Sequence, residues 1–216
     1  MRTDTGQEMS RLEHLMWEVY DHVRDHGARI YEGGASVAEA TYLQELTRRS
    51  GAVTVAEIGF NIAFSSIAFL ESSPHTTVVS FELDRRRAVE LAKEFVDERY
   101  PGRHELVIGD SRETVPLHPG GFDLVFVDGG HEYEIAAADI ANAARIAKPD
   151  GLVVMDDLVP WYPWGEGPYQ AWQEAVAAGL IEPVESVVDG RVVDVITEPG
   201  DRAWATGRFT RTKEFG

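Results

Sequence analysis

Apolar residues near the start of the chain recur with the spacing of helices. Between residues 12 and 23 they return every three or four positions, which gathers them on one helix face. A capping-box pattern, Ser36-Val-Ala-Glu39, predicts the start of a second helix that runs to Arg49. Residues 1–50 are therefore expected to form a helical extension that acts as a lid or as a dimer contact.

From residue 51 the pattern changes to short β-branched runs that alternate with helical stretches. The expected strands are 53–58, 77–82, 104–109, 123–127 and 151–155. Helices are expected from about Ser65, from Asp84 and over 132–148. Apolar strands separated by helices are typical of a parallel sheet that is covered on both faces.

The C-terminal segment departs from these repeating units. Residues 191–197 and 202–209 have the pattern of two strands joined by a tight turn, which predicts an antiparallel hairpin. The expected fold class is therefore α/β, with N-terminal helices ahead of a Rossmann-like, doubly wound sheet of seven strands. This sheet spans residues 51–216, is mostly parallel and ends in the antiparallel hairpin.

Composition narrows the class of partner. The chain has 216 residues, of which 44% are apolar, enough for one large core. Its 37 acidic and 20 basic residues give a net charge of −17, which argues against nucleic acid or an anionic membrane surface as a main partner. The absence of cysteine excludes disulfides and thiolate zinc sites. No apolar run reaches the ~20 residues of a membrane span, and the polar first ten residues lack the apolar core of a signal peptide, so a cytoplasmic protein is expected.

In an open α/β sheet, ligands bind at the carboxyl ends of the strands, so the residues that follow each strand are the candidate site. Gly59 follows the first strand and leads into a helix, which lets backbone N–H groups approach an anionic or polar group. Asn61 and Phe64 stand where the dinucleotide fingerprint G-x-G-x-x-G needs glycine. The glycine turn therefore indicates either a ligand site of another kind or a plain turn between strand and helix.

Acidic residues also end the second and third strands. Glu82 lies a little over 20 residues past the glycine turn and is placed to bind the hydroxyls of a ribose. Asp110 and Ser111 form a polar turn suited to the edge of an adenine. The alternatives are a solvated carboxylate at position 82 and a helix N-cap at position 110.

Three carboxylates follow the fourth and fifth strands, at Asp128, Asp156 and Asp157. Neighbouring strands lie about 4.8 Å apart, so these side chains would meet at one rim. Close carboxylates repel one another, and they either take up protons or bind a divalent cation such as Mg²⁺, Mn²⁺ or Ca²⁺. The alternative is that Asp157 caps a helix, although two prolines and bulky aromatics follow it.

Two further groups lie beside these carboxylates in the sequence. His131 follows Asp128 by three residues and is a candidate proton acceptor near neutral pH, or else an exposed loop histidine. Trp161, Tyr162 and Trp164 follow the fifth strand; such rigid aromatics either wall an organic substrate or pack a loop onto the core.

The motifs together resemble the class I S-adenosylmethionine-dependent methyltransferases. EIGFNIAFS (57–65) is similar to their first motif, E-x-G-x-x-x-G-x-S, SFELD (80–84) to their ribose motif, and AKPDGLVVMDD (147–157) to their fifth strand and the loop before it. DGGHEYE (128–134) and MDD (155–157) resemble the metal-dependent O-methyltransferases of the catechol and macrocin/sugar types. The resemblance covers roughly residues 53 to 210.

The resemblance implies a role for each matching residue. It assigns Glu57, Gly59 and Ser65 to the methionine end of S-adenosylmethionine, Glu82 to the ribose, Asp110 and Ser111 to the adenine, Asn61 to the cofactor, Asp128 to both the cofactor and the metal, and Asp156 and Asp157 to the metal. His131 stands where the catechol enzymes keep a basic catalytic lysine, and Ala63 replaces the second glycine of the first motif.

The expected activity is methyl transfer from S-adenosylmethionine to a hydroxyl of a small molecule: a phenol or catechol, a sugar, or a natural-product intermediate. The hydroxyl oxygen would coordinate Mg²⁺ (or Mn²⁺ or Ca²⁺) beside Asp128, and His131 would take its proton. The alternatives are a metal-independent methyltransferase, a nicotinamide-dependent oxidoreductase, which the missing glycines disfavour, and a non-catalytic cofactor-binding protein. A homodimer through the N-terminal helices is also expected.

Overall fold

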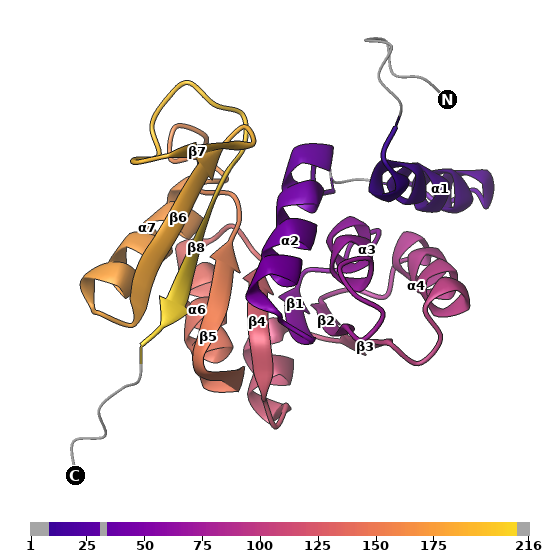
Figure 1. Cartoon of the computed structure of the whole chain (residues 1–216), viewed down its shortest axis with the longest axis horizontal. Helices are drawn as coiled ribbons and strands as arrows, with labels where there is room; N and C mark the ends of the chain where they lie inside the picture. The colour runs from indigo at the N-terminus through magenta and orange to yellow at the C-terminus, as the bar shows by residue number, and fades with distance from the viewer. Residues whose placement is uncertain (1–8, 31–33, 211–216) are drawn as a thin grey trace.

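A computed structural model of the chain describes residues 9–30 and 34–210. In these residues, eight strands form one sheet in the order β3-β2-β1-β4-β5-β8-β6-β7 (Figure 1). The parallel strands are β1 (Thr54–Ile58), β2 (Thr77–Glu82), β3 (His104–Ile108), β4 (Phe122–Val127) and β5 (Ala147–Met155). The antiparallel strands are β6 (Ile181–Val188), β7 (Arg191–Val193) and β8 (Ala203–Phe209). The predicted α/β class with a mostly parallel sheet is confirmed.

Helices cover both faces of the sheet. They are α1 (Arg11–Asp25), α2 (Val37–Ser50), α3 (Phe64–Leu70), α4 (Arg87–Arg99), α5 (Ser111–Thr114), the 3₁₀ helix η1 (Val115–Leu117), α6 (Tyr133–Ile146) and α7 (Glu166–Ala177). Side chains alternate along each strand, so Val55 packs in one core with α1 to α4, and Ala56 packs in a second core with α6 and α7. The sheet is therefore the middle of three layers, as in doubly wound folds (Figure 1).

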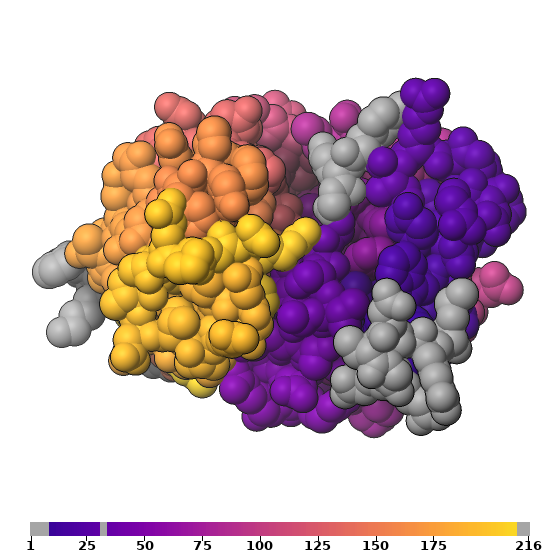
Figure 2. Space-filling view, turned by 90° about the horizontal axis from the view of Figure 1, so that it is seen from above, coloured from indigo at the N-terminus to yellow at the C-terminus, as the bar shows by residue number. Residues whose placement is uncertain are grey.

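The N-terminal helices begin and end where the sequence predicts. Ser36 caps α2 through the expected capping box with Glu39, and Gly51 ends the helix in the left-handed conformation (φ 72°). The Tyr42 hydroxyl on α2 lies 2.6 Å from Thr206 Oγ1 on β8. In Figure 2 the purple surface of α2 accordingly meets the yellow surface of the C-terminal strands. The polar first eight residues, in which no signal peptide is predicted, lie outside the described residues.

The pairing of the C-terminal strands corrects the predicted hairpin. β8 pairs with β6, not with residues 191–197, and only Arg191–Val193 of that segment form a strand, β7, which pairs with β6. The sheet thus has eight strands instead of seven. Sequence patterning overlooks β6 because Glu182, Pro183 and Glu185 interrupt its apolar run, and the register of β6 against β8 shifts between Pro183 and Glu185.

Helix α7 was also not predicted, because aromatic residues, prolines and glycines dominate the segment before it. Its glycine permits close packing. A Cβ atom at Gly167 would lie 2.3 Å from the carbonyl oxygen of His131, so the start of α7 sits directly against the loop after β4. None of the described helices is both long enough and apolar enough to cross a lipid bilayer.

Candidate active site

The carboxyl ends of the central strands define the candidate site. Strand order reverses between β1 and β4, which opens a crevice at the ends of these two strands. Asp128 N donates to Ile58 O at 2.9 Å, and Asp156 N donates to Val127 O at 3.0 Å. The sheet's hydrogen bonding therefore continues one residue beyond β4 and β5, and it fixes the backbone of both acids at the rim.

A cavity of about 740 Å³ lies along this rim. It brings together most of the residues predicted for the site: Gly59, Asn61, Glu82, Asp110, Ser111, Asp128, His131, Asp156, Asp157 and Trp164. Glu57, Ser65, Trp161 and Tyr162 do not line it.

The turn after β1 requires its glycine. Gly59 has φ 98°, and a Cβ atom there would lie 1.9 Å from the carbonyl oxygen of Asp128. Asn61 and Ala63 also have positive φ, 46° and 68°. Position 63, where the family motif has its second glycine, thus adopts a left-handed conformation that an alanine enters at a steric cost.

Glu82 is bound to this turn. Its Oε2 accepts hydrogen bonds from the N–H groups of Phe60 (3.2 Å) and Asn61 (2.9 Å), and its Oε1 accepts one from Asp84 N (3.3 Å). Arg86 lies 3.6 Å from the same carboxylate. Glu82 is therefore a buried, hydrogen-bonded group that lines the cavity, and not a freely solvated strand-end carboxylate.

Glu57 lies beneath the cavity, fully buried in a polar cluster. Its Oε2 accepts hydrogen bonds from the hydroxyls of Ser66 and Ser80, and Ser80 Oγ lies 2.9 Å from His104 Nε2. Burial raises the pKa of Glu57 to about 7, although the serine hydroxyls oppose this shift. Burial also lowers the pKa of His104 to about 3. The predicted roles of Glu57 and Ser65 at the methionine end stay predictions.

The turn after β3 combines a helix cap with a buried acid. Asp110 caps α5, and its hydrogen bonds with Arg112 lower its pKa to about 2. The hydroxyl of Ser111 donates to Asp139 Oδ1 at 2.6 Å. Asp139, on α6, is fully buried, and burial raises its pKa to about 6. It was missed by sequence reasoning because nothing in the pattern of α6 separates it from a solvent-facing acid.

The three predicted metal ligands meet in the same cavity. Asp128, Asp156 and Asp157 each offer an oxygen within 4.8 Å of the others. Burial, followed by the charge of Asp157, raises the pKa of Asp156 to about 7, and burial together with the charge of Asp156 raises that of Asp128. Asp157 has a left-handed backbone (φ 58°) and does not cap a helix, since the next helix, α7, begins at Glu166 with Gly165 as its N-cap.

This set of oxygen donors fits a hard divalent cation. Three carboxylates that burial and mutual repulsion destabilise are stabilised by a nearby positive ion, and Mg²⁺, Mn²⁺ and Ca²⁺ prefer oxygen ligands. Asp128 and Asp156 would present oxygens from rigid strand ends, and Asp157 would present one from the following turn.

His131 lies at the mouth of the cavity beside these acids. Its Nε2 is 2.8 Å from Asp157 Oδ2, and its side chain is 48% exposed. The imidazole is therefore held at the rim while it remains reachable by a small molecule in the cavity.

The aromatic residues after β5 divide into two groups. Trp164 lines the cavity and stacks on Tyr162, with ring centroids 4.4 Å apart. Trp161 Nε1 donates to Gly200 O at 2.8 Å, and the Tyr162 hydroxyl donates to Asp201 at 3.2 Å. Trp161 and Tyr162 thus bind the turn before β8, and their predicted contact with substrate stays a prediction.

Two charged residues at the rim were missed by sequence reasoning. Glu39, on α2, is fully buried, and its Oε2 lies 3.3 Å from Arg202 Nη1. Arg202 lines the cavity just before β8. The sequence revealed only the capping role of Glu39, because its contact with Arg202 joins residues 163 positions apart.

Comparisons with known proteins agree with the fold. Residues 56–158 match a family model described as a methyltransferase domain. No curated protein matches the sequence. Among solved structures, the fold is similar to that of the O-methyltransferase TomG from Streptomyces achromogenes in complex with S-adenosylmethionine, with 18% identity, a TM-score of 0.73, and coverage of 94% of this chain and 91% of that one.

Two more structures show the same likeness. The O-methyltransferase from Bacillus cereus in complex with S-adenosylhomocysteine has 17% identity, a TM-score of 0.70, and coverage of 94% and 92%. Cofactor-bound Rv0187 from MTB has 19% identity, a TM-score of 0.75, and coverage of 96% and 92%. The chain therefore has the fold of these methyltransferases, and its resemblance to the class I S-adenosylmethionine-dependent methyltransferases is confirmed. Its closer resemblance to the metal-dependent types stays a prediction.

Proposed function

We propose that the protein is an S-adenosylmethionine-dependent O-methyltransferase whose reaction is assisted by a divalent cation. The observation that carries this proposal is one cavity that is lined both by the glycine turn and Glu82 and by three convergent carboxylates and His131. The first set of residues suits an adenosine and its methionine chain, and the second suits a hydroxyl group that must lose a proton.

Each group of residues in the cavity is proposed to have one role in the reaction. Glu82 binds the ribose hydroxyls, and the turn at Gly59 and Asn61 gives the cofactor access to backbone N–H groups. When bound to Asp128, Asp156 and Asp157, Mg²⁺ or Mn²⁺ supplies Lewis acidity that lowers the pKa of a substrate hydroxyl. Bound S-adenosylmethionine would supply the methyl group from its sulfonium sulfur, with a C–S bond broken and a C–O bond formed, and His131 would accept the proton of the substrate hydroxyl.

The substrate is proposed to be a small hydroxylated molecule: a phenol or catechol, a sugar, or a natural-product intermediate. Trp164, half exposed at the cavity, offers an aromatic wall for it. The net charge of −17 supports a small molecule over nucleic acid as the partner.

We further propose that the protein is cytoplasmic and forms a homodimer through its N-terminal helices. Sedimentation analysis would test the homodimer.

Isothermal titration with S-adenosylhomocysteine and with NADH tests the cofactor class, and titration with Mn²⁺ tests the metal. Binding of S-adenosylhomocysteine and Mn²⁺, with methyl transfer to a catechol, phenol or sugar that chelation abolishes, supports the proposal. Full transfer in EDTA would favour a metal-independent methyltransferase. Binding of NADH alone would favour an oxidoreductase, and cofactor binding without transfer to any hydroxylated substrate would favour a non-catalytic protein.

A further inference from the structure

Helix α2 brings a fourth carboxylate to the predicted cation site. Glu39 is fully buried and occupies the third position of α2, where its Oε2 accepts a hydrogen bond from Ser36 N at 3.3 Å. Its side chain lies within hydrogen-bonding reach of Asp156. The carboxylate therefore faces inward from the N-terminal helices onto the acid that ends β5.

The second oxygen of Glu39 has no donor. Oε1 is buried and receives no hydrogen bond from any group in the described part of the chain. Leaving a buried charged oxygen unpaired is costly, so its presence beside Asp156 calls for either a proton or a positive ion in that space.

Arg202 holds Glu39 and the chain before α2 in place. Its Nη1 lies 3.3 Å from Glu39 Oε2, and its Nη2 donates to Gly34 O at 3.1 Å. The backbone N–H of Arg202 donates to Asp189 Oδ1 at 3.0 Å, which fixes the residue itself. One guanidinium thus connects the turn before β8 to the segment 34–39, which reaches the cavity at Gly34.

When all of them are ionised, the carboxylates at this rim are not balanced by the nearby arginine. Four carboxylates, those of Glu39, Asp128, Asp156 and Asp157, gather around the single guanidinium of Arg202. That guanidinium is already turned toward Oε2 of Glu39 and the Gly34 carbonyl. A divalent ion among the acids would remove most of the excess negative charge.

We propose that Glu39, held by Arg202, is a positioning residue that aligns Asp156 for the divalent cation and links occupation of the cation site to the segment 34–39 above the cavity. This inference rests on the proposed function, and it adds a residue outside the strand-end motifs. Partners of this outer kind tune metal affinity by roughly 10- to 100-fold.

The test compares Mn²⁺ binding by wild type, Glu39→Gln and Glu39→Asp after removal of metals with EDTA. Glutamine at this helix position also completes a capping box, so the fold is expected to persist. Aspartate keeps the charge but is one methylene shorter and does not reach Asp156. Both variants should bind Mn²⁺ about tenfold more weakly and give an altered electron paramagnetic resonance spectrum of bound Mn²⁺.

Controls separate this role from a loss of structure. Glu185→Gln removes a carboxylate that pairs with Arg49 of α2 far from the rim, and it should leave Mn²⁺ affinity unchanged. Circular dichroism in EDTA should show that both Glu39 variants are folded, and their affinity for S-adenosylhomocysteine without metal should match wild type. If either fails to fold, Arg202→Lys, which retains the charge but loses the two-pronged contact, should show the same weakening.

Three results would overturn the inference. Unchanged Mn²⁺ affinity in both Glu39 variants would show that the residue only caps α2. Weakening in Glu39→Gln with wild-type binding in Glu39→Asp would show that only net charge matters. A wild-type protein that binds no Mn²⁺ would remove the proposed cation site, and this inference with it, while S-adenosylhomocysteine binding would still test the methyltransferase proposal.

Discussion

The carboxylate of Glu82 both shapes the glycine turn and faces the cavity. Because Oε2 holds the N–H groups of Phe60 and Asn61, the side chain organises the backbone that the cofactor approaches. We expect Glu82→Ala to weaken S-adenosylhomocysteine binding by about 1–3 kcal/mol, since ribose hydroxyls and two buried N–H groups lose an acceptor. Isothermal titration measures the loss, and hydrogen exchange at residues 60 and 61 should accelerate. Wild-type affinity for S-adenosylhomocysteine in a folded variant would show that Glu82 does not bind the cofactor.

His131 can be tested separately, because its ring contacts Asp157 after β5, whereas Glu82 contacts the turn after β1. We expect His131→Gln to lower kcat by roughly 10²–10⁴-fold and to leave S-adenosylhomocysteine affinity intact, since proton removal is needed only in the transition state. The acidic limb of the kcat/KM profile should disappear in the variant. His75→Gln, an exposed loop substitution, is the matched control. A variant that keeps both the wild-type kcat and the acidic limb would show that His131 is an exposed loop histidine and does not accept the proton.

For single residues, the sequence predicts where a side chain lies in the fold better than it predicts which distant side chain it contacts. The strand ends place Gly59, Asp128 and Asp156 at one rim, and the structure brings them together there. The pairing of Glu39 with Arg202 could not be predicted, because it depends on how α2 packs against the turn before β8. Short-range patterns carry no information about such contacts.

The elements that sequence patterning missed share a physical cause. β7 is an edge strand, and it covers only Ser186–Val188 of β6, so charged residues are tolerated in both. α7 buries a face of mostly small residues behind a start rich in proline and glycine. By contrast, β1, β2 and β4 are largely buried on both faces, have continuous apolar runs and were identified.

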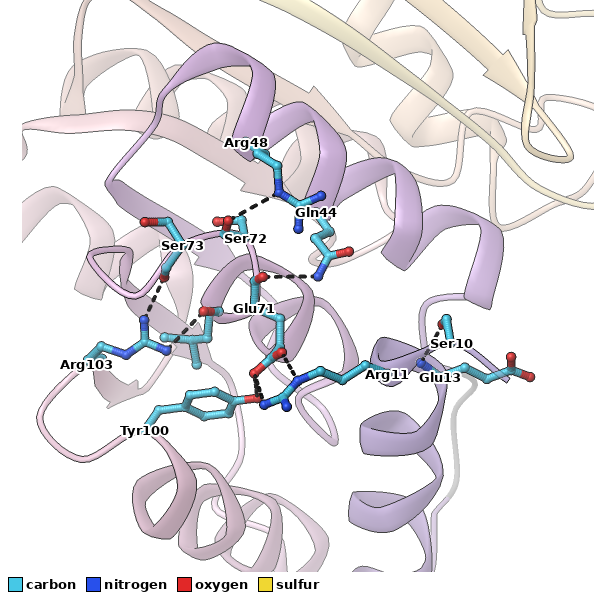
Figure 3. A network of polar contacts seen from close by, with 11 residues as sticks. Ser10, Arg11, Glu13, Gln44, Arg48, Glu71, Ser72, Ser73, Tyr100 and Arg103 are labelled. Atoms are coloured by element: carbon cyan, nitrogen blue, oxygen red, sulfur yellow. Dashed lines mark hydrogen bonds and ion pairs between the residues drawn. The ribbon is translucent and has the colours of Figure 1, made fainter. Parts of the chain in front are cut away.

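Glu71, just after α3, joins three helices at one point (Figure 3). Arg11 Nε on α1 donates to its Oε2 at 2.6 Å, and the buried Tyr100 hydroxyl after α4 donates to its Oε1 at 2.9 Å. Gln44 on α2 donates to its carbonyl oxygen at 3.1 Å. These contacts, with Arg103 bound to the carbonyls of Ser73 and Leu70, attach the N-terminal helices to the sheet's helical layer.

We expect Glu71→Gln to reduce the free energy of unfolding at pH 7 by about 1 kcal/mol, because charged acceptors make stronger hydrogen bonds than neutral ones. Hydrogen bonds from Arg11 and Tyr100 lower the pKa of Glu71 despite its burial. A lowered carboxyl pKa stabilises the fold above the ordinary pKa and loses that stabilisation as the pH falls.

The difference between wild type and Glu71→Gln should therefore shrink as acid is added, and urea titrations at pH 7 and pH 3 measure it. Arg11→Ala should cost less, because the Arg11 side chain is 80% exposed. A Glu71→Gln protein as stable as wild type at pH 7 would contradict the anchoring role.

Across the whole molecule, the two apolar cores and the acidic rim have opposite effects on stability. The apolar layers on both faces of the sheet hold the fold without a ligand, whereas the rim gathers acids that repel one another. Loops and strand ends are where a fold tolerates such arrangements for function. The stability of the molecule should therefore depend on whether a cation occupies the rim.

We expect Mn²⁺ to raise the thermal unfolding temperature of wild type, because a ligand that binds only the folded state stabilises it by about 2.7 kcal/mol at a hundred times its dissociation constant. Asp156→Asn should abolish most of this shift, since Asp156 is buried between Asp128 and Asp157. Asp157→Asn should reduce it less. Its left-handed backbone suits asparagine, and its side chain is partly exposed and shared with His131. Differential scanning fluorimetry in EDTA, in Mn²⁺ and in Mg²⁺ measures the unfolding temperature of each protein.

Equal increases in unfolding temperature in wild type and both variants would show that the ion binds elsewhere. No increase in wild type would argue for a reaction that needs no metal.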